Sequence, residues 1–180
     1  MLSVRQARDQ DALILAPRLR MEDIREIRAA SGADALEALT DGIRRSTPCF
    51  TIIDTKNRPV AVFGVVPDSN ARAERVGIVW MLSSAELATH SITFLRHCGE
   101  WIDKLQQIYA LLWNDVDARN HMSIQWLKWC GFVFIELRES HGFEERAFFR
   151  FARYRSFNNP SRSSFLAHAG QTISDRKSVV

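Results

Sequence analysis

The sequence predicts a single α/β or α+β domain in which a mixed sheet carries helices on its faces. Three observations lead to this prediction. The chain has 180 residues, a length that suits one domain with a sizeable core. Hydrophobic residues make up 46% and charged residues 25%, as is typical of a globular chain, which excludes wholesale disorder. Strand-like and helix-like segments alternate, with hairpins at both ends of the order.

The N-terminal half shows both hydrophobic periodicities. Residues 2–7 alternate apolar and polar side chains, which predicts a short strand. Met21, Ile24 and Ile27 recur at three-residue spacing, which predicts a helix. The elements that these patterns predict are a strand at 2–7, helices at 9–15, 20–30 and 33–45, a hairpin of strands at 49–54 and 59–66, and a buried strand at 76–82.

The C-terminal half contains the clearest helix, at 84–107, where apolar residues such as Leu87, Phe94 and Trp101 form a stripe at helical spacing. From Ser156 onward Ser, Asn, Pro and Arg dominate and the periodicity fades, so we expect a tail that is mobile or ordered by a partner. The other predicted elements are a strand at 108–113, a helix at 120–130, and paired strands at 132–137 and 147–154.

The net charge of +3 hides an uneven distribution. Residues 1–145 hold 17 Lys and Arg against 20 Asp and Glu, a net charge of −3. Residues 146–180 hold seven basic residues against one acidic residue, a net charge of +6. This basic end has two interpretations. Its arginines and aromatics contact nucleic acid or an acidic protein surface, or it is a strand with solvated arginines followed by a soluble tail.

Several classes of protein are excluded by simple patterns. The longest apolar run, 60–66, is about a third of the ~20 residues that a membrane-spanning helix needs. The first residues lack the basic-then-apolar layout of a secretory signal. Cys49, Cys98 and Cys130 are odd in number and widely spaced, so we expect neither a disulfide framework nor a zinc site, and a reducing compartment. No metal site is expected.

The segment that begins at Asn120 resembles a motif of the GNAT superfamily, the acyl-CoA N-acyltransferases. That family commonly shows an Asn, an Ala three residues later, a Tyr seven later, and Gly-Phe at eleven and twelve. In this chain Gly131 and Phe132 match, while Ser123 replaces the Ala and Leu127 replaces the Tyr. The residues themselves indicate that Asn120 caps a helix and that Gly131 ends it in a left-handed turn.

Together with the element order, this resemblance implies the GNAT fold: a mixed, mostly antiparallel central sheet flanked by helices, with a C-terminal tail. We expect one GNAT-like domain over residues 1–155 and a basic, Ser- and Arg-containing tail over 156–180. The resemblance also implies an acetyl-CoA groove between the strands at 76–82 and 108–113.

A GNAT enzyme holds the CoA pyrophosphate on backbone N–H groups where the fourth strand enters the long helix. In this chain that loop contains no glycine, so its backbone cannot easily approach a diphosphate. Ser83 and Glu86 have the spacing of a capping box, which favours a helix capped by its own side chains. If CoA binds, the residues expected to hold it are Ser83, Ser84, Ala85, Leu87 and Asn120.

Catalytic groups are sparse in the predicted groove. The Tyr that often protonates the departing CoA thiolate falls on Leu127, which cannot transfer a proton. The carboxylates nearest to the predicted strands are Glu74, Asp115 and Asp117, which are weak candidates for a catalytic base. Proximity alone accelerates acyl transfer, so missing acid and base groups do not exclude activity.

A narrower resemblance covers residues 1–154. The strings 112–120 and 124–132, with the terminal Phe148–Phe151, resemble a GNAT-like family encoded by short-tailed phages. Members are described as internal virion or assembly proteins. The resemblance implies protein contacts in virion assembly or DNA delivery, phage virion or assembly proteins as partners, and a location in the host cytoplasm or the virion.

Two functional hypotheses therefore stand. The first is a phage-encoded GNAT-fold protein that works through protein contacts and carries a degenerate acyl-CoA site. The second is an acetyl-CoA-dependent N-acetyltransferase that modifies a host or phage amine. Non-specific nucleic-acid contact through the tail is a third. Trp126 and Trp129 cannot easily face one side of the short helix along with Leu127 and Cys130, so we expect one in the core and read an exposed aromatic there as an interaction signal. The interface candidates are Trp126, Trp129, Arg150, Arg153 and Arg155.

Overall fold

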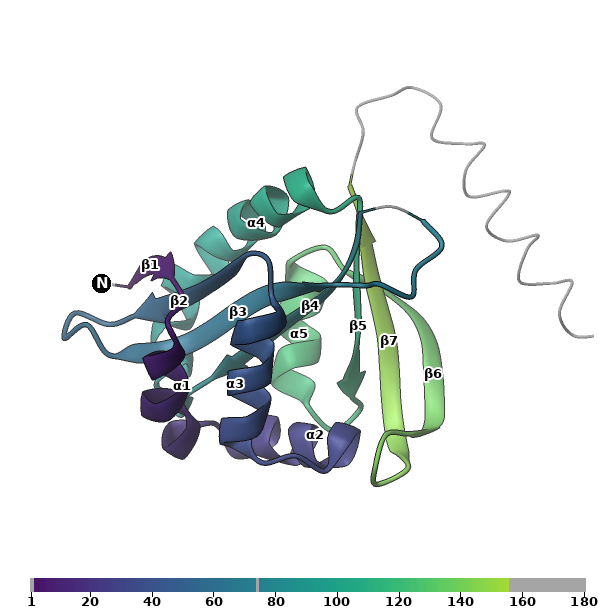
Figure 1. The fold of residues 1–180 in the computed structure, drawn as a ribbon, viewed down its shortest axis with the longest axis horizontal. Coiled ribbons are helices and arrows are strands. Elements are labelled where there is room, and N and C mark those ends of the chain that lie inside the picture. The colour runs from purple at the N-terminus through teal and green to yellow at the C-terminus, as the bar shows by residue number, and fades with distance from the viewer. Residues whose placement is uncertain (1, 74, 156–180) are drawn as a thin grey trace, which may run out of the picture.

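The computed structural model describes residues 2–73 and 75–155, and these residues form one seven-stranded sheet with helices on both faces (Figure 1). The expected tail at 156–180 and Glu74 lie outside the described residues. The strands are β1 (Ser3–Gln6), β2 (Cys49–Ile53), β3 (Pro59–Pro67), β4 (Val76–Ser83), β5 (Leu111–Asp117), β6 (Val133–His141) and β7 (Arg146–Tyr154). The helices are α1 (Asp9–Leu15), α2 (Met21–Ser31), α3 (Ala35–Arg45), α4 (Ser91–Ile108) and α5 (His121–Trp129), with 3₁₀ turns η1 (Ala16–Arg18) and η2 (Ala85–His90).

The strand order across the sheet is β1-β2-β3-β4-β5-β7-β6. Every neighbouring pair is antiparallel except β4 and β5, which are parallel. A parallel pair needs a crossover connection, and η2 with α4 supplies it. The predicted fold class, a mixed and mostly antiparallel sheet flanked by helices, is confirmed.

Two apolar cores lie on opposite faces of the sheet. Helices α1–α3 cover one face, where Leu15, Leu39 and Val62 are fully buried. Helices α4 and α5 cover the other face, where Leu105 and Leu112 are buried (Figure 1). Burial on both sides explains why β3 and β4 are continuous apolar runs in the sequence rather than alternating ones.

The parallel strands β4 and β5 separate soon after they pair. Their register covers only Val76–Ile78 against Leu111–Trp113, whereas β4 continues to Ser83 and β5 to Asp117. The two strands therefore form a V whose open end lies at their carboxyl termini. This gap interrupts the sheet at its centre and positions the site described below.

Two local predictions are confirmed, and one is wrong. Asn120 is the N-cap of α5, where its side chain accepts a hydrogen bond from the Ser123 N–H, and Gly131 follows the helix with φ of 79°. The predicted capping box of Ser83 and Glu86 does not form. The Ser83 N–H donates to Asp23 instead, and the long helix begins as the 3₁₀ turn η2.

The predicted strand at 108–113 is shifted along the chain. Ile108 is the last residue of α4, and β5 runs through four residues that were expected to be loop. Asn114 and Asp115 in this extension are polar because they line the central gap. The strand therefore lacks the apolar pattern that predicts a buried strand from sequence. No helix in the described ranges is both long and apolar enough to cross a membrane.

Close packing at the start of the V gives a test of the fold. A Cβ on Gly77 would lie 2.2 Å from Val65 Cγ1 and 2.9 Å from Tyr109 Cδ1, so Gly77→Ala should lower the free energy of unfolding by about 1–3 kcal/mol. Gly99→Ala is the matched control, because a Cβ there meets nothing within 4 Å and Ala favours a helix. Urea unfolding measures both. Equal stabilities of the two variants would contradict this packing.

Candidate functional site

The V between β4 and β5 opens into a cavity of about 920 Å³, at the upper end of the size range of small-molecule sites. Its walls come from α2 and α3 on one face of the sheet and from α4 and α5 on the other. Trp80, Trp101 and Trp126 contribute aromatic surface. The described lining residues include no Lys or Arg, but four of them carry carboxylates: Glu26, Glu37, Asp41 and Asp115.

The open edge of β4 presents backbone groups to this cavity. In an antiparallel pair, the backbone N–H and C=O groups of alternate residues point away from the partner strand. On β4 the odd-numbered residues have their backbone groups directed away from β3. Val79 C=O accepts a hydrogen bond from Asn114 Nδ2 (2.9 Å), and Ser83 C=O accepts one from the Arg20 N–H (3.0 Å). Met81 lies midway between them and lines the cavity. Its N–H and C=O therefore face the gap, where an extended amide can pair with them.

Helix α2 holds the open end of the V through side chains at three-residue spacing. Asp23 accepts the Ser83 N–H (2.9 Å) at the end of β4 and forms a buried ion pair with Arg20. The Arg20 guanidinium also donates to Ser123 Oγ (3.0 Å) and lies 5.1 Å from the Trp126 ring centroid. Because α5 carries Ser123 and Trp126, this pair links β4 to α5.

Glu26, one turn beyond Asp23, holds the other arm of the V. Its carboxylate accepts hydrogen bonds from Asn120 Nδ2 (2.8 Å) and from the Asp117 N–H (3.2 Å), and it lines the cavity. Burial raises the pKa of Glu26 to about 8; the charges of Asp23 and Asp117 act in the same direction, and the Asn120 hydrogen bond opposes them. A carboxylate that titrates near pH 8 can accept a proton under neutral conditions.

Sequence reasoning missed Glu26. Its hydrogen-bond partners lie more than 90 residues away along the chain, and its own helix offers no signal that separates it from its acidic neighbours. Asn120, a predicted cofactor residue, is buried and joins Glu26 to the α5 cap. The candidate base Asp117 is buried and bound to Arg119. Burial acts to raise the pKa of Asp117, but the pairing with Arg119 outweighs it, and the pKa is lowered.

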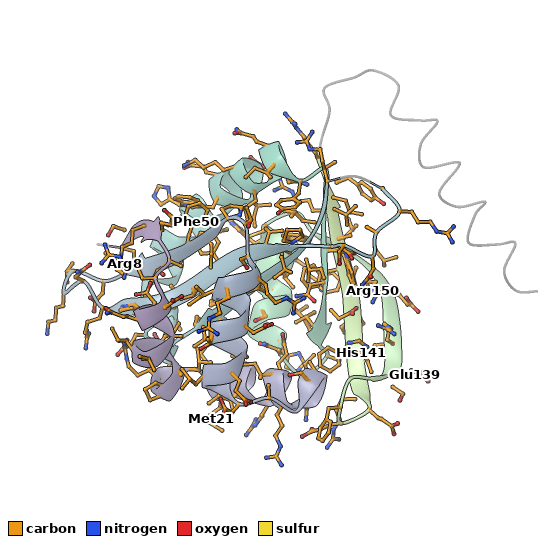
Figure 2. The ribbon with its side chains drawn as sticks, viewed as in Figure 1. Arg8, Met21, Phe50, Glu139, His141 and Arg150 are labelled. Carbon is orange, nitrogen blue, oxygen red and sulfur yellow. The ribbon has the colours of Figure 1, made fainter. Side chains whose placement is uncertain are left out.

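The candidate base Asp115 is held by two arginines and a histidine from the β6–β7 hairpin. Arg150 contacts it through two nitrogens (3.0 and 2.9 Å), Arg138 lies at 3.4 Å and His141 at 3.6 Å. Figure 2 labels Arg150 and His141 in this part of the sheet. The Arg150 guanidinium also lies 4.5 Å from the Trp113 ring centroid. Asp115 therefore joins three strands, and its oxygens are already shared among these side chains.

The predicted phosphate loop uses its own N–H groups within the fold. The Ser83 N–H bonds to Asp23, the Ser84 N–H to Val60 C=O (2.8 Å), and the Leu87 N–H to Ser84 C=O (3.1 Å). Ala85 is exposed, and the neighbouring Glu86 is ion-paired with Arg18. These three N–H groups are therefore not available to a diphosphate, which prefers a cradle of unpaired N–H groups. The cavity and the free edge of β4 do fit the thioester and amide-bearing arm of acetyl-CoA.

The interface candidates lie in different environments. Trp126 is buried in the cavity wall, whereas Trp129 is 68% exposed. Arg150 is committed to Asp115, Arg153 Nη2 pairs with Asp103 (2.7 Å), and the Arg155 N–H donates to Ala110 C=O. Of this set, Trp129 thus contributes most to the outer surface. Within 2–73 and 75–155, no group of three or more His, Cys, Asp or Glu side chains is arranged to hold a metal ion.

Comparison of the fold with solved structures finds N-acetyltransferases. A GCN5-related N-acetyltransferase from Kribbella flavida superimposes with a TM-score of 0.63 at 16% identity, covering 86% of this chain and 98% of its own. The ribosomal-protein-S5-alanine acetyltransferase of Vibrio fischeri gives 0.61 at 16% identity, with 88% and 96% covered. A spermidine N-acetyltransferase from Vibrio cholerae, in complex with CoA and spermine, gives 0.59 at 12% identity, with 85% and 95% covered.

These likenesses show that the chain has the GNAT fold. No protein-family model matches the sequence, and no curated protein matches it. The expected phage branch is not shown by any comparison.

The half-buried carboxyl of Glu26 makes stability depend on pH. Its folded-state pKa of about 8 lies above the ordinary value of 4.5, so the folded protein retains a proton that the unfolded chain releases. The free energy of unfolding should therefore fall as pH rises from about 4.5 to 8. Glu26→Gln removes this loss and should be more stable than the wild type by about 1 kcal/mol or more at pH 9.

Urea unfolding of both proteins at pH 5 and pH 9 checks this, with the exposed Glu22→Gln on the same helix as the control for lost charge. The Glu26→Gln advantage should appear at pH 9 and nearly vanish at pH 5. An equal advantage at the two pH values would rule out a raised pKa as its cause.

Proposed function

We propose that this chain is an N-acyltransferase that transfers the acetyl group of acetyl-CoA to an amine of the host or of a phage. The observation that carries the proposal is the V between β4 and β5, which opens into a ligand-sized cavity with Glu26 on its wall. The likeness to solved N-acetyltransferases supports it independently. Neither feature depends on the motifs that the sequence lacks.

The chain's own residues suit the binding of a thioester arm. When bound, acetyl-CoA supplies an acyl group activated as a thioester. Met81 offers its N–H and C=O to the amides of the arm, as a neighbouring strand would. Trp101, Leu127 and Phe132 line the adjoining cavity, exclude water and fix the arm by apolar contact. Holding donor and acceptor together in this gap provides the proximity on which acyl transfer depends.

Glu26 is the group that removes a proton from the attacking amine. Its oxygen accepts the proton as the amine nitrogen bonds to the acyl carbon; the carbon–sulfur bond of the thioester then breaks, and the departing thiolate takes up a proton and leaves as the thiol. Asn120 and the Asp117 N–H keep the carboxylate oriented. A base with a pKa of about 8 is matched to this transfer near neutral pH. The sequence candidates Asp115 and Asp117 are instead committed to arginines.

The charge of the cavity favours a cationic acceptor. The described lining contains no Lys or Arg, and Glu37 and Asp41 on α3 bring carboxylates to it, which favours a protonated amine over an anionic substrate. Glu37 and Asp41 lie one turn apart on α3, where Glu37 accepts the Asp34 N–H (3.1 Å) and Asp41 pairs with Arg45 (2.9 Å). The similar structure from Vibrio cholerae is a spermidine acetyltransferase with bound spermine, which supports an aliphatic polyamine as the first acceptor to test.

A second candidate function is the assembly role implied by the phage resemblance. We propose it on a separate observation: the edge strand β6 exposes an apolar row formed by Val133, Ile135 and Leu137, with Trp129 nearby in sequence. An edge strand with exposed apolar side chains is a surface on which another protein can pair. Virion or assembly proteins are the proposed partners, and nucleic acid is the proposed partner of the tail. This function does not need acetyl-CoA.

Affinity should depend little on the diphosphate of the cofactor. Because the Ser83, Ser84 and Leu87 N–H groups are used within the fold, acetyl-CoA and S-acetylpantetheine should bind with dissociation constants within about tenfold of each other, a difference below ~1.4 kcal/mol. Isothermal titration calorimetry measures both. A preference for acetyl-CoA of a hundredfold or more would show a diphosphate site. No binding of either at millimolar concentration would remove the enzyme proposal and favour the assembly role.

Removing the proposed base should slow transfer without removing binding. Glu26→Gln is expected to lower kcat/KM by about 10²–10⁴ and to abolish the rise in rate that the wild type shows as pH approaches 8. The readout is release of the CoA thiol from acetyl-CoA in the presence of spermidine and other aliphatic diamines. Glu22→Gln should behave as the wild type. Wild-type rates and pH profile in Glu26→Gln would show that Glu26 is not the base.

A further inference from the structure

Two cysteine thiols that are distant in sequence meet in the cavity wall. Cys98 on α4 and Cys130, immediately after α5, have their sulfur atoms 3.0 Å apart, and both are free thiols. The two helices belong to the face opposite α2, so the thiols are separate from the Glu26 cluster. Both residues line the cavity, which gives a small solute a route to the buried Cys98 and the half-buried Cys130.

The two thiols are not equivalent. The Cys130 S–H donates a hydrogen bond to Cys98 Sγ, and this bond lowers the pKa of Cys98; burial opposes the shift and the charge of Arg153 assists it. The same bond and burial raise the pKa of Cys130. Cys98 is therefore the thiol that ionises first and reacts as the nucleophile, with Cys130 held in contact as its partner.

Arg153 provides a guanidinium whose hydrogen-bonding groups the fold satisfies only in part. Its Nη2 pairs with Asp103 (2.7 Å), but its Nη1 is buried and has no hydrogen-bond partner among the described residues. A Cβ on Gly131, next to Cys130, would lie 3.5 Å from Arg153 Nε, so this guanidinium lies beside the chain at the end of α5, and its charge acts to lower the pKa of both thiols. A buried N–H without a partner costs stability. A thiolate on Cys98 would place a negative charge near this cation.

We propose that Cys98 and Cys130 form an oxidisable dithiol that peroxides convert to a disulfide in the cavity wall. The Cys98 thiolate attacks one peroxide oxygen, the O–O bond breaks, and hydroxide leaves, so that Cys98 becomes a sulfenic acid. Cys130 sulfur then attacks the Cys98 sulfur, the S–O bond breaks, and water leaves with the Cys130 proton. The peroxide is reduced, and the two thiols are oxidised by two electrons.

The product fits the fold with a small movement. The sulfur atoms need to approach from 3.0 Å to the bonding distance of about 2.05 Å. The bond then joins α4 to the C-terminal end of α5 across one side of the cavity. The site does not depend on acyl transfer, and it forms equally if the chain has only an assembly role.

The full chain, reduced and then treated with hydrogen peroxide, provides the test. Remaining thiols are alkylated and the digest is analysed by mass spectrometry. We expect a peptide in which Cys98 is joined to Cys130, with Cys49 alkylated. Cys49 is an internal control because it is also buried, and burial raises its pKa to about 11. In Cys130→Ser the reaction should stop at a Cys98 sulfenic acid, which a cyclic dione traps.

Variants of Arg153 test whether the two thiols form a reactive site or only touch. Arg153→Gln should slow alkylation of Cys98 by iodoacetamide at pH 7 about tenfold, and Arg153→Lys should restore most of the rate, with circular dichroism confirming that each variant is folded. Oxidation of Cys49 at the same rate as Cys98, or recovery of Cys98 and Cys130 as independent sulfinic acids with no joined peptide, would overturn the proposal.

Discussion

The ion-paired and hydrogen-bonded face of α2 is the constraint on which the site depends. Two parallel strands that separate after three residue pairs leave backbone groups without partners, and such groups are costly inside a protein. Asp23 accepts a hydrogen bond from the backbone N–H at the end of β4, and Glu26 accepts one from the backbone N–H at the end of β5. Arg20 balances the charge of Asp23 and attaches α5. The V stays open because one helix is bonded to both of its arms.

The same arrangement gives the cavity its chemistry. Placing Glu26 beside Asp23 and Asp117 brings three carboxylates together, and only Asp23 and Asp117 have arginine partners. Glu26 is therefore the carboxylate that retains its proton longest as pH rises. Structural support and proton transfer are thus carried by one side chain. On the opposite wall the thiols of Cys98 and Cys130 are grouped in a comparable way around Arg153, so the cavity has two separate sites whose protonation the fold controls.

The sequence predicted the fold better than the site. Periodicity located the helices and strands, and Asn120 with Gly131 and Phe132 indicated the right family of folds, because caps and turns are encoded locally. The capping box of Ser83 and Glu86 was wrong because Asp23, sixty residues earlier, takes the Ser83 N–H. The sequence also failed to predict the role of Glu26 and the contact between Cys98 and Cys130, for the same reason. Each depends on pairings between distant segments, which spacing along one chain does not reveal.

The protonation of Glu26 tests the central claim most directly. Carbon-13 NMR of protein labelled at glutamate side-chain carboxyl groups, with Glu26→Gln used to assign the resonance, follows this group through a pH titration. The account predicts a midpoint near pH 8, well above the ordinary value of 4.5, and a change in the Glu26 resonance when acetyl-CoA is added. A midpoint near 4.5, with a resonance unmoved by saturating acetyl-CoA, would contradict both the buried carboxyl cluster and its role in acyl transfer.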